Sequence, residues 1–257
     1  MRTGRLSDTL PIGHQAKPLL TDTNEMIPLK ADLHIHTAED PEDLILYSAT
    51  ELIDRAASLG YQVLSITNHN SSVYSAYLRS YAAERGIVLI PGMEATIEGR
   101  HILLYNMDFS RVDRGSIQGL RSLKRPDTLI IAPHPFFPST VALGRRLVEN
   151  MEIFDAVELC HLYTKYFDFN TKAQRFAETR GLPLVGTSDA HQRVQFHTTY
   201  SLIEAEPHPE AIIDAVRQGR VSVVTRPLTL PRVLAITGKM AWRNEILQRI
   251  QTWRRIR

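Results

Sequence analysis

The sequence predicts an α/β fold, because short apolar runs alternate with amphipathic helical stretches from residue 29 onward. Alternation at this spacing is typical of right-handed strand–helix–strand units, which build a mostly parallel sheet. About seven such units favour a barrel over an open sheet, although spacing alone does not show that a barrel closes. With 257 residues and 43% apolar composition, the chain can bury the core of one such domain.

The individual elements follow from local patterns along the chain. In the first helical stretch, Ser48 and Glu51 form a capping box, and Gly60 stands just past the end of the helix. We expect helices over residues 48–59, 72–85, 115–122, 140–150, 168–180 and 208–218. We expect strands over residues 29–35, 61–67, 86–92, 101–106, 128–132, 154–159, 182–186, 198–203 and 221–224.

The two ends of the chain differ from this regular region. Residues 1–28 are polar with scattered proline, glycine and threonine, so we expect an N-terminal arm or lid ahead of a domain spanning residues 29–231. Residues 232–257 should form a basic amphipathic helix that packs its apolar side on the domain and leaves its basic face solvated. The alternatives for this basic face are a contact with nucleic acid or with a membrane surface.

Composition narrows the class of protein. The formal net charge of +2 gives the whole molecule no drive towards nucleic acid or membranes. Cys160 is the single cysteine, which excludes an internal disulfide and favours a reducing compartment. The N-terminus lacks the apolar stretch of a signal peptide, and no run approaches the roughly 18 apolar residues of a membrane span. We therefore expect a cytoplasmic protein, while its oligomeric state stays open.

Most of the ten histidines stand at or beside the ends of the apolar runs, often with a carboxylate close by. In the segment His34-Ile35-His36 the two imidazoles share one face of a strand, because side chains alternate along it. Asp32 lies on that face too, where it would orient a histidine or act as a further ligand. Imidazole and carboxylate suit Zn, Mn and Fe, and about nine such ligands are too many for one ion. The sequence therefore predicts two or three divalent ions in one cleft.

Five short segments carry a resemblance to a known family. They are DLHIHT at residues 32–37, ITNHN at 66–70, GME at 92–94, APHP at 132–135 and GTSDAH at 186–191. In order and spacing, these segments are similar to the motifs of PHP (polymerase and histidinol phosphatase) domains. The resemblance covers residues 32–227. It implies a distorted (β/α)7 TIM-like barrel, a cluster of up to three divalent metals, and hydrolysis of phosphoesters.

Carried over position by position, the resemblance implies three sets of metal ligands. The first set is His34, His36, Glu94 and Asp189. The second set is Glu94, His101 and His134, so that Glu94 bridges two ions. The third set is His69 and His191 with an acidic residue of the loop after the first strand, which is Asp40 or Asp43, and we favour Asp40.

The chain departs from the family pattern in two places. It has Thr67-Asn68-His69-Asn70 where relatives usually have TDHD; the ligand histidine is kept, but the loss of two acids would retune metal preference. His161 stands where many relatives carry asparagine, and its role stays open between a phosphate hydrogen-bond donor, an additional ligand and a structural residue. Cys160 beside it should point to the opposite side of the strand, into the core.

These expectations combine into a metal-dependent phosphoesterase, a hydrolase that cleaves a phosphomonoester with a metal-activated water. His191 or His161 would protonate the leaving oxygen, and Arg100, Arg193 and Lys165 are candidate phosphate contacts. We favour a small phosphorylated metabolite or nucleotide as substrate over nucleic acid. The alternatives are a nuclease acting on oligonucleotide ends and a metal-bound scaffold without activity, but degenerate scaffolds lose ligands and this chain keeps nearly all of them.

Overall fold

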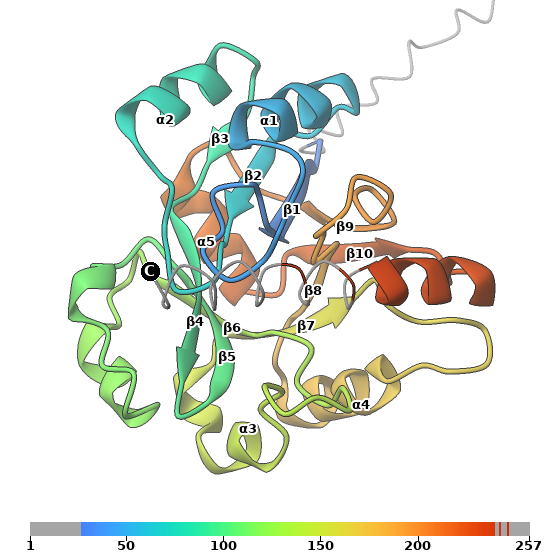
Figure 1. Cartoon of the computed structure of the whole chain (residues 1–257). Helices are drawn as coiled ribbons and strands as arrows, with labels where there is room; N and C mark the ends of the chain where they lie inside the picture. The colour runs from blue at the N-terminus through green and yellow to red at the C-terminus, as the bar shows by residue number, and fades with distance from the viewer. Residues whose placement is uncertain (1–26, 240–241, 243–245, 247–257) are drawn as a thin grey trace, which may run out of the picture.

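The protein is described by a computed structural model in which residues 27–239, 242 and 246 are placed, and its strands form two five-stranded sheets (Figure 1). The first sheet has the strand order β10 (Val221–Thr225), β9 (Thr199–Ile203), β1 (Leu29–Ile35), β2 (Val63–Ile66) and β3 (Val88–Leu89). The second has the order β4 (Gly92–Ile97), β5 (Arg100–Tyr105), β6 (Leu129–Ala132), β7 (Ala156–Cys160) and β8 (Leu184–Thr187). The predicted α/β class is therefore confirmed.

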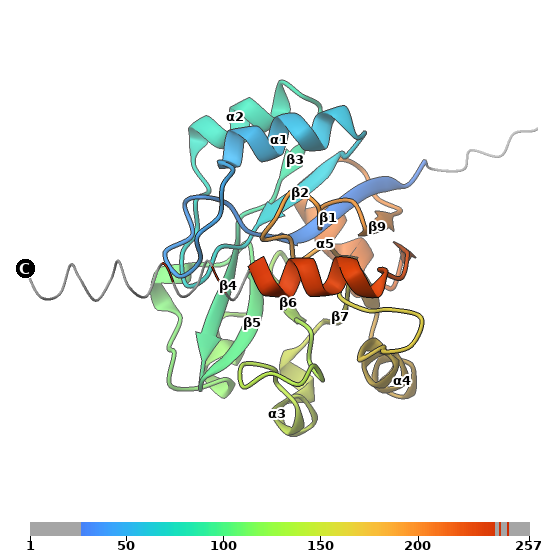
Figure 2. The ribbon, with the colours of Figure 1, turned by 45° about the vertical axis from the view of Figure 1, so that its right-hand side comes forward.

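Helices cover the outer faces of both sheets. The α-helices are α1 (Ala49–Ser58), α2 (Ala76–Ala83), α3 (Arg145–Glu149), α4 (Asn170–Arg180) and α5 (Pro209–Arg217), and the 3₁₀ helices are η1 (Phe109–Arg111), η2 (Gln118–Leu123) and η3 (Met151–Ile153). The predicted capping box at Ser48 and Glu51 is present at the start of α1. In Figures 1 and 2, α1 and α2 lie together beside β2 and β3, whereas α3 and α4 lie on the opposite side of the molecule.

The sheets are mixed rather than mostly parallel. Strand β1 pairs with β2 in parallel and with β9 in antiparallel orientation, while β5 is antiparallel to both β4 and β6. The apolar run at 86–92 predicts a single strand, so β4 was not expected. In the structure the chain forms β3 and then enters a hairpin made of β4 and β5. The hairpin turn is formed by Glu98 and Gly99, whose φ angles of 49° and 71° suit a tight two-residue turn.

A continuous barrel is not confirmed, because the two sheets are separate hydrogen-bonded units. Two isolated parallel bridges connect them, one between Ile35 and Ala190 and the other between His69 and Glu94. An apolar cluster fills the space that the sheets enclose and joins Leu33 of the first sheet to Leu103 of the second. The second sheet also contacts the first through the Tyr105 hydroxyl, which donates a 2.8 Å hydrogen bond to the Leu33 carbonyl.

The two terminal segments of the sequence analysis fall mostly outside the described residues. Of the expected arm at 1–28, only residues 27 and 28 are described. Of the expected helix at 232–257, residues 232–239, 242 and 246 are described and helical, and the helix also includes residues 230 and 231. None of the helices in the described part of the chain has the length and apolar character needed to cross a bilayer.

Replacing Gly92 with alanine should destabilise the protein, because β4 passes too close to β2 for a side chain. A Cβ atom there would collide with the Ser65 hydroxyl and come within 2.9 Å of Thr67 Cγ2. We expect a loss of about 1–3 kcal/mol in the free energy of unfolding, measured by urea denaturation. The control is Gly119→Ala, where the nearest atom to the new Cβ, on Ser116, would be at an ordinary 3.6 Å. Equal stability of the two variants would contradict this packing.

Candidate metal centre

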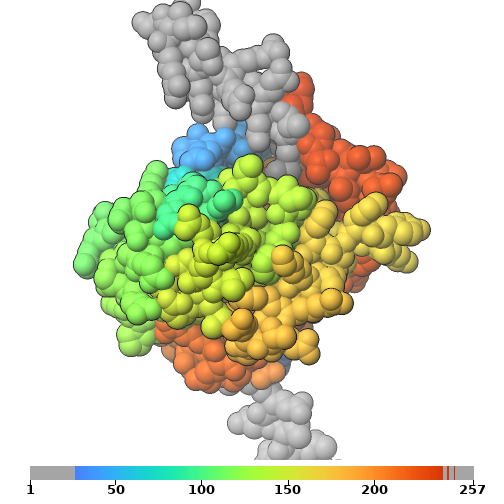
Figure 3. All heavy atoms as spheres, turned by 90° about the horizontal axis from the view of Figure 1, so that it is seen from below, coloured from blue at the N-terminus to red at the C-terminus, as the bar shows by residue number. Residues whose placement is uncertain are grey.

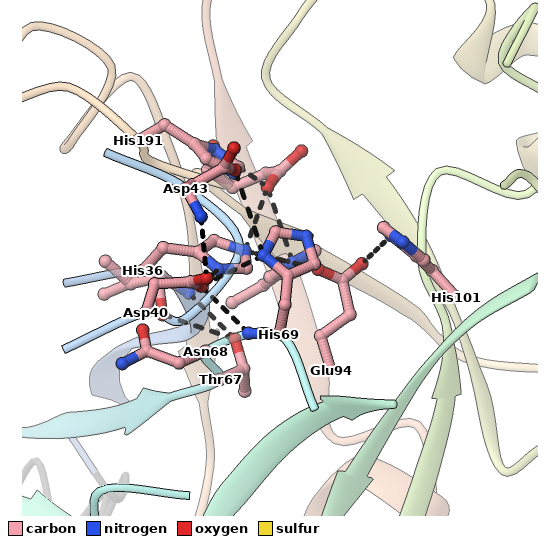
Figure 4. A network of polar contacts seen from close by, with 12 residues as sticks. His36, Asp40, Asp43, Thr67, Asn68, His69, Glu94, His101 and His191 are labelled. Carbon is pink, nitrogen blue, oxygen red and sulfur yellow. Dashed lines mark hydrogen bonds and ion pairs between the residues drawn. The ribbon is translucent and has the colours of Figure 1, made fainter. Parts of the chain in front are cut away.

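The ligands predicted for the three ions come together at one edge of the two sheets, where their side chains point toward one another (Figure 4). Some of them follow a strand, as His36 directly follows β1 and Asp189 lies two residues beyond β8, while His34 and Glu94 lie within β1 and β4. His101 is the second residue of β5. Since β5 runs antiparallel to its neighbours, its first residues lie at the same edge as the carboxyl ends of the other strands. The hairpin therefore adds a histidine to the cluster.

The predicted ligands lie where the two sheets are joined by the two isolated bridges. One isolated bridge pairs Ile35, which stands between two ligand histidines, with Ala190, which stands between Asp189 and His191. The other bridge pairs His69 with Glu94, which are both predicted ligands. The contacts that join the sheets at this edge thus also set the positions of the ligands.

The first predicted ligand set brings four ligand atoms close together. The Nε2 atoms of His34 and His36 are 3.1 Å apart. Glu94 Oε2 lies 3.4 and 3.3 Å from these two atoms, and Asp189 Oδ1 lies 3.4 and 3.5 Å from them. Ligands at about 2.0–2.1 Å from a tetrahedral ion are separated by about 3.3 Å, close to these distances. The ligand atoms of His34, His36 and Asp189 form one of the groups that could hold an ion.

Glu94 also reaches the second predicted ligand set with its other oxygen. Its Oε1 lies 2.8 Å from His101 Nδ1 and 3.2 Å from His134 Nε2. The carboxylate is almost fully buried, with 1% of its surface exposed. One side chain therefore presents each of its oxygens to a different group of histidines, which is the geometry that a bridging ligand needs.

The third predicted group contains His69, His191 and an acid of the loop after β1. The ligand atoms of His69, His191 and His36 lie within 4.8 Å of one another. Asp43 Oδ2 lies 2.8 Å from His191 Nε2 and 3.8 Å from His69 Nδ1. His69 Nε2 also lies 3.1 Å from Glu94 Oε2, so this histidine stands between two groups.

Asp40 already has hydrogen-bond donors on both oxygens. Its Oδ2 faces His36 Nδ1 at 2.9 Å and His69 Nδ1 at 3.0 Å, and accepts the His69 backbone N–H at 2.9 Å. Its Oδ1 accepts the backbone N–H groups of Glu42 and Asp43. A ring that donates from Nδ1 keeps the lone pair of Nε2 free for a metal. The position of Asp40 thus suits an orienting residue better than a ligand.

Glu158 contacts His34 as Asp40 contacts His36, and it was not among the residues predicted from the sequence. Its Oε1 faces His34 Nδ1 at 2.6 Å and accepts the hydroxyl of Thr187, while Oε2 accepts the His134 backbone N–H at 2.6 Å. The sequence feature that could have indicated its role is an acidic residue within the wholly buried strand β7, between Val157 and Leu159. A carboxylate in such a run needs buried donors, and here they come from Thr187 and from two of the predicted ligands.

Asp32 binds backbone rather than a histidine ring. Its Oδ1 accepts the N–H groups of His34 at 3.3 Å and Ser188 at 3.1 Å. It therefore holds β1 against the segment after β8. Burial raises the pKa of Asp32 to about 7, with the bonds to Ser188 and His34 acting in the opposite direction.

The ring nitrogens and carboxylates of the cluster stabilise each other's charges. Burial alone would lower the pKa of His34, but the carboxylates of Asp189, Glu158 and Glu94 raise it well above its usual value. For His69, burial and the His36 charge lower the pKa, yet Glu94 and Asp40 together raise it to about 10. Burial would raise the pKa of Glu94, but the surrounding histidines hold it well below its usual range. Without metal, the histidines therefore hold protons where ions would bind.

His161 lies outside the cavity into which the metal cluster opens, whereas Cys160 lines it. The cavity has a volume of about 460 Å³, and its lining includes Cys160 and Leu162. The His161 ring is buried, with its Nε2 3.2 Å from the side-chain nitrogen of Gln195. Burial lowers the pKa of His161 to about 4, so the ring is neutral. Cys160 is buried as predicted, and its Sγ lies 3.7 Å from His161 Nδ1 and 3.9 Å from Asp189 Oδ2.

The three predicted phosphate-binding cations lie in different surroundings. Arg193 points at the start of α1, where it pairs with Glu51 at 2.7 Å. Lys165 is exposed in the loop after β7 and does not line the metal cavity. Arg100 lines a second cavity that adjoins the metal cavity. Of these three cations, the structure thus brings only Arg100 near the centre.

Comparison with known proteins supports the family resemblance. Residues 167–221, from the loop before α4 to the start of β10, match the family described as PHP-associated. The fold resembles a two-domain protein of Bacteroides vulgatus that contains a predicted PHP-like metal-dependent phosphoesterase. The TM-score is 0.63 with 20% identity, over 84% of this chain and 70% of that one. Both comparisons thus show a likeness to PHP-like proteins, one over residues 167–221 and the other in the fold.

Two curated proteins are similar in sequence to parts of this chain. An uncharacterised protein of Methanocaldococcus jannaschii is 28% identical over 149 residues, which cover 50% of this chain and 82% of the relative. A 3′,5′-nucleoside bisphosphate phosphatase of Chromobacterium violaceum is 30% identical over 95 residues. That match covers 36% of this chain and 32% of the phosphatase, so the PHP-like chain spans about a third of that enzyme's length.

Zinc binding to the metal-free protein should release protons near neutral pH. Because the pKa of His69 is raised to about 10 and that of His34 well above its usual value, both rings carry protons that an ion must displace. Titration calorimetry at about pH 7.5, in buffers of different ionisation enthalpy, should show about one proton or more per ion. Binding heats that do not depend on the buffer would contradict these protonation states.

The same pKa shifts make the stability of the metal-free protein depend on pH. A raised histidine pKa contributes stability that is complete below the unfolded value of about 6.5 and is lost as the pH rises towards the folded value. For His69 this window extends to about 10. The melting temperature of the metal-free protein should therefore fall across this window, and that of the zinc-loaded protein should fall less.

Proposed function

We propose that this PHP-like protein hydrolyses phosphomonoesters at a centre of two or three divalent metal ions. The observation that carries the proposal is the position of Glu94, whose two oxygens face different histidine groups at 2.8–3.4 Å. Zn, Mn and Fe suit these nitrogen and oxygen ligands. The fold and family resemblance support the same reaction class.

The ligand assignment follows the three groups, with one change from the sequence analysis. The first ion would be held by His34, His36, Glu94 and Asp189, and the second by Glu94, His101 and His134. For the third we assign Asp43 in place of Asp40, together with His69 and His191, because the oxygens of Asp40 are engaged by N–H groups. When bound, such ions lower the pKa of a coordinated water and offset charge on a phosphoryl group.

The chain's own residues prepare the centre for these ions. Asp40 and Glu158 accept hydrogen bonds from the Nδ1 atoms of His36 and His34, which fixes each ring with Nε2 towards the cluster. The apolar interior beneath the cluster keeps bulk water from that side. Electrostatic interactions with a phosphate are stronger in such surroundings than in open solvent.

His191 cannot be a metal ligand and a proton donor through the same atom. Its Nε2 lies 2.8 Å from Asp43 Oδ2, on the wall of the cavity. A coordinated nitrogen carries no proton, so His191 donates to the leaving oxygen only when the third position is empty. His161 takes no part in this proposal, because its neutral ring lies outside the cavity lining.

An enzyme is favoured over a metal-bound scaffold because the cluster lacks none of its predicted ligands. Their side chains are preorganised by buried carboxylates, and they border an open cavity of about 460 Å³. A purely structural ion needs closed coordination and no adjoining cavity. Space for a substrate beside the ligands therefore supports catalysis.

Exchanging Glu94 for glutamine should remove most turnover. An amide supplies one oxygen instead of two and no charge, so the two ligand groups lose their shared partner. We expect kcat on the best substrate of a panel of phosphomonoesters, diesters and short oligonucleotides to fall by more than about 100-fold. The control is Glu178→Gln, on the exposed side of α4. If Glu94→Gln retained the wild-type kcat, the bridging role would be wrong.

A further inference from the structure

The turn that follows β8 carries two of the proposed ligands, Asp189 and His191, which belong to different ions. Asp189 has a φ angle of 43°, in the left-handed region that residues other than glycine rarely adopt. Such a conformation costs free energy and persists only where surrounding contacts hold it. Part of this support comes from the first sheet, because the Ala190 carbonyl accepts the His36 N–H at 3.2 Å and the Tyr47 hydroxyl at 2.6 Å. The groups on either side of Ala190 are held by a different residue.

Gln195 makes hydrogen bonds to both sides of this turn, and it is buried, with 1% of its surface exposed. Its Oε1 accepts the His191 backbone N–H at 3.1 Å, and its Nε2 donates to the Asp189 carbonyl at 3.3 Å. That carbonyl also lies 3.1 Å from His191 Nδ1, and a ring that donates from Nδ1 keeps Nε2 available for an ion. One side-chain amide therefore connects the backbone of both ligands.

His161 is the third partner of this amide. Because a backbone N–H always donates and a carbonyl always accepts, the two bonds to the turn fix which end of the Gln195 side chain carries the nitrogen. The nitrogen then has one hydrogen left, and His161 Nε2 lies 3.2 Å from it. His161 must accept this bond, so its own proton is on Nδ1, which lies 3.7 Å from Cys160 Sγ. Only a neutral ring can do so, and burial lowers the pKa of His161 to about 4.

The segment that carries Gln195 is itself held by the helix over residues 230–239. The Gln192 side chain donates a 2.9 Å hydrogen bond to the Ile236 carbonyl of this helix. In Figure 3 the orange-red part of the chain that includes the helix lies beside the yellow loop that follows β7, and this loop begins at His161. The helix therefore limits movement of the segment, so the backbone of Gln195 has a defined position.

We propose that Gln195 and His161 are positioning residues of the metal centre. Gln195 holds the backbone of Asp189 and His191 in one arrangement. His161 keeps the Gln195 amide turned towards them and acts only through its contacts, because it does not line the metal cavity. The inference rests on the proposed metal centre and gives His161 a role outside the reaction itself. The ion between β5 and the segment after β6 has neither of the two ligands of this turn, so its affinity should not depend on the amide.

The test measures zinc affinity by competition with a chromophoric chelator, a readout that does not depend on hydrolysis. Gln195→Met keeps the length of the side chain but removes its three polar contacts, so the ions bound by Asp189 and His191 should bind about tenfold more weakly. His161→Leu removes the acceptor and should have a similar effect. His161→Gln supplies an acceptor oxygen at a similar reach and should recover most of the affinity. Packing alone predicts the opposite order, because leucine suits a buried site better than glutamine.

A double variant tests whether His161 acts through Gln195. Adding His161→Leu to Gln195→Met should lower the zinc affinity by less than about twofold more, because the amide that His161 orients is already gone. The control is Thr128→Val, which removes a buried hydroxyl bonded to the backbone of Arg125. Thr128 precedes β6 and His134 follows it, so the control lies at the far end of the strand from the ligands. It should lower the melting temperature and leave the zinc affinity unchanged.

The outcomes separate the positioning role from the proposed function. Wild-type affinity in a folded Gln195→Met variant, or losses that add in the double variant, would overturn the positioning role while the metal centre stood. Melting curves identify a variant that does not fold, and the comparison of His161→Leu with His161→Gln then decides alone. If the protein bound zinc but hydrolysed no phosphomonoester, the proposed function would fail, and the affinities would still decide the positioning role.

Discussion

The arrangement of this molecule depends on one buried carboxylate among five histidines. Glu94 is the third residue of β4 and lies within 3.4 Å of ring nitrogens from both sheets. A buried carboxylate without partners is costly, and so is a buried charged histidine, but each offsets the other here. Without metal, this mutual neutralisation keeps the cluster together, and it also explains why its histidines hold protons. Metal ions would take over the same neutralising role.

The orientations of the histidine rings in the cluster are fixed by hydrogen bonds to neighbouring carboxylates. Asp40 and Glu158 each hold a histidine by Nδ1 and also accept backbone N–H groups of other ligand segments. Asp32 ties the backbone of His34 to that of Ser188. Three buried acids therefore connect the segments that carry the ligands, so a change in any of them should disturb several ligands at once.

The clustering of most proposed ligands could be predicted from the sequence, because its signals are local. His34 and His36 share a strand face by alternation, and Glu94 and Asp189 stand in short motifs of fixed spacing. The hairpin of β4 and β5 was not predicted, since one apolar run covers both β3 and the entry to β4. The choice between Asp40 and Asp43 and the role of Glu158 depend on contacts between distant segments, which periodicity does not report.

The proposed bridging of two metal ions by Glu94 can be tested by anomalous diffraction from crystals of protein never exposed to chelator. Elemental analysis of the same sample gives the number of ions per chain. We expect at least two ions, one on each side of the Glu94 carboxylate, with Asp43 rather than Asp40 bound to any third ion. A single ion, or none in contact with Glu94, would contradict it.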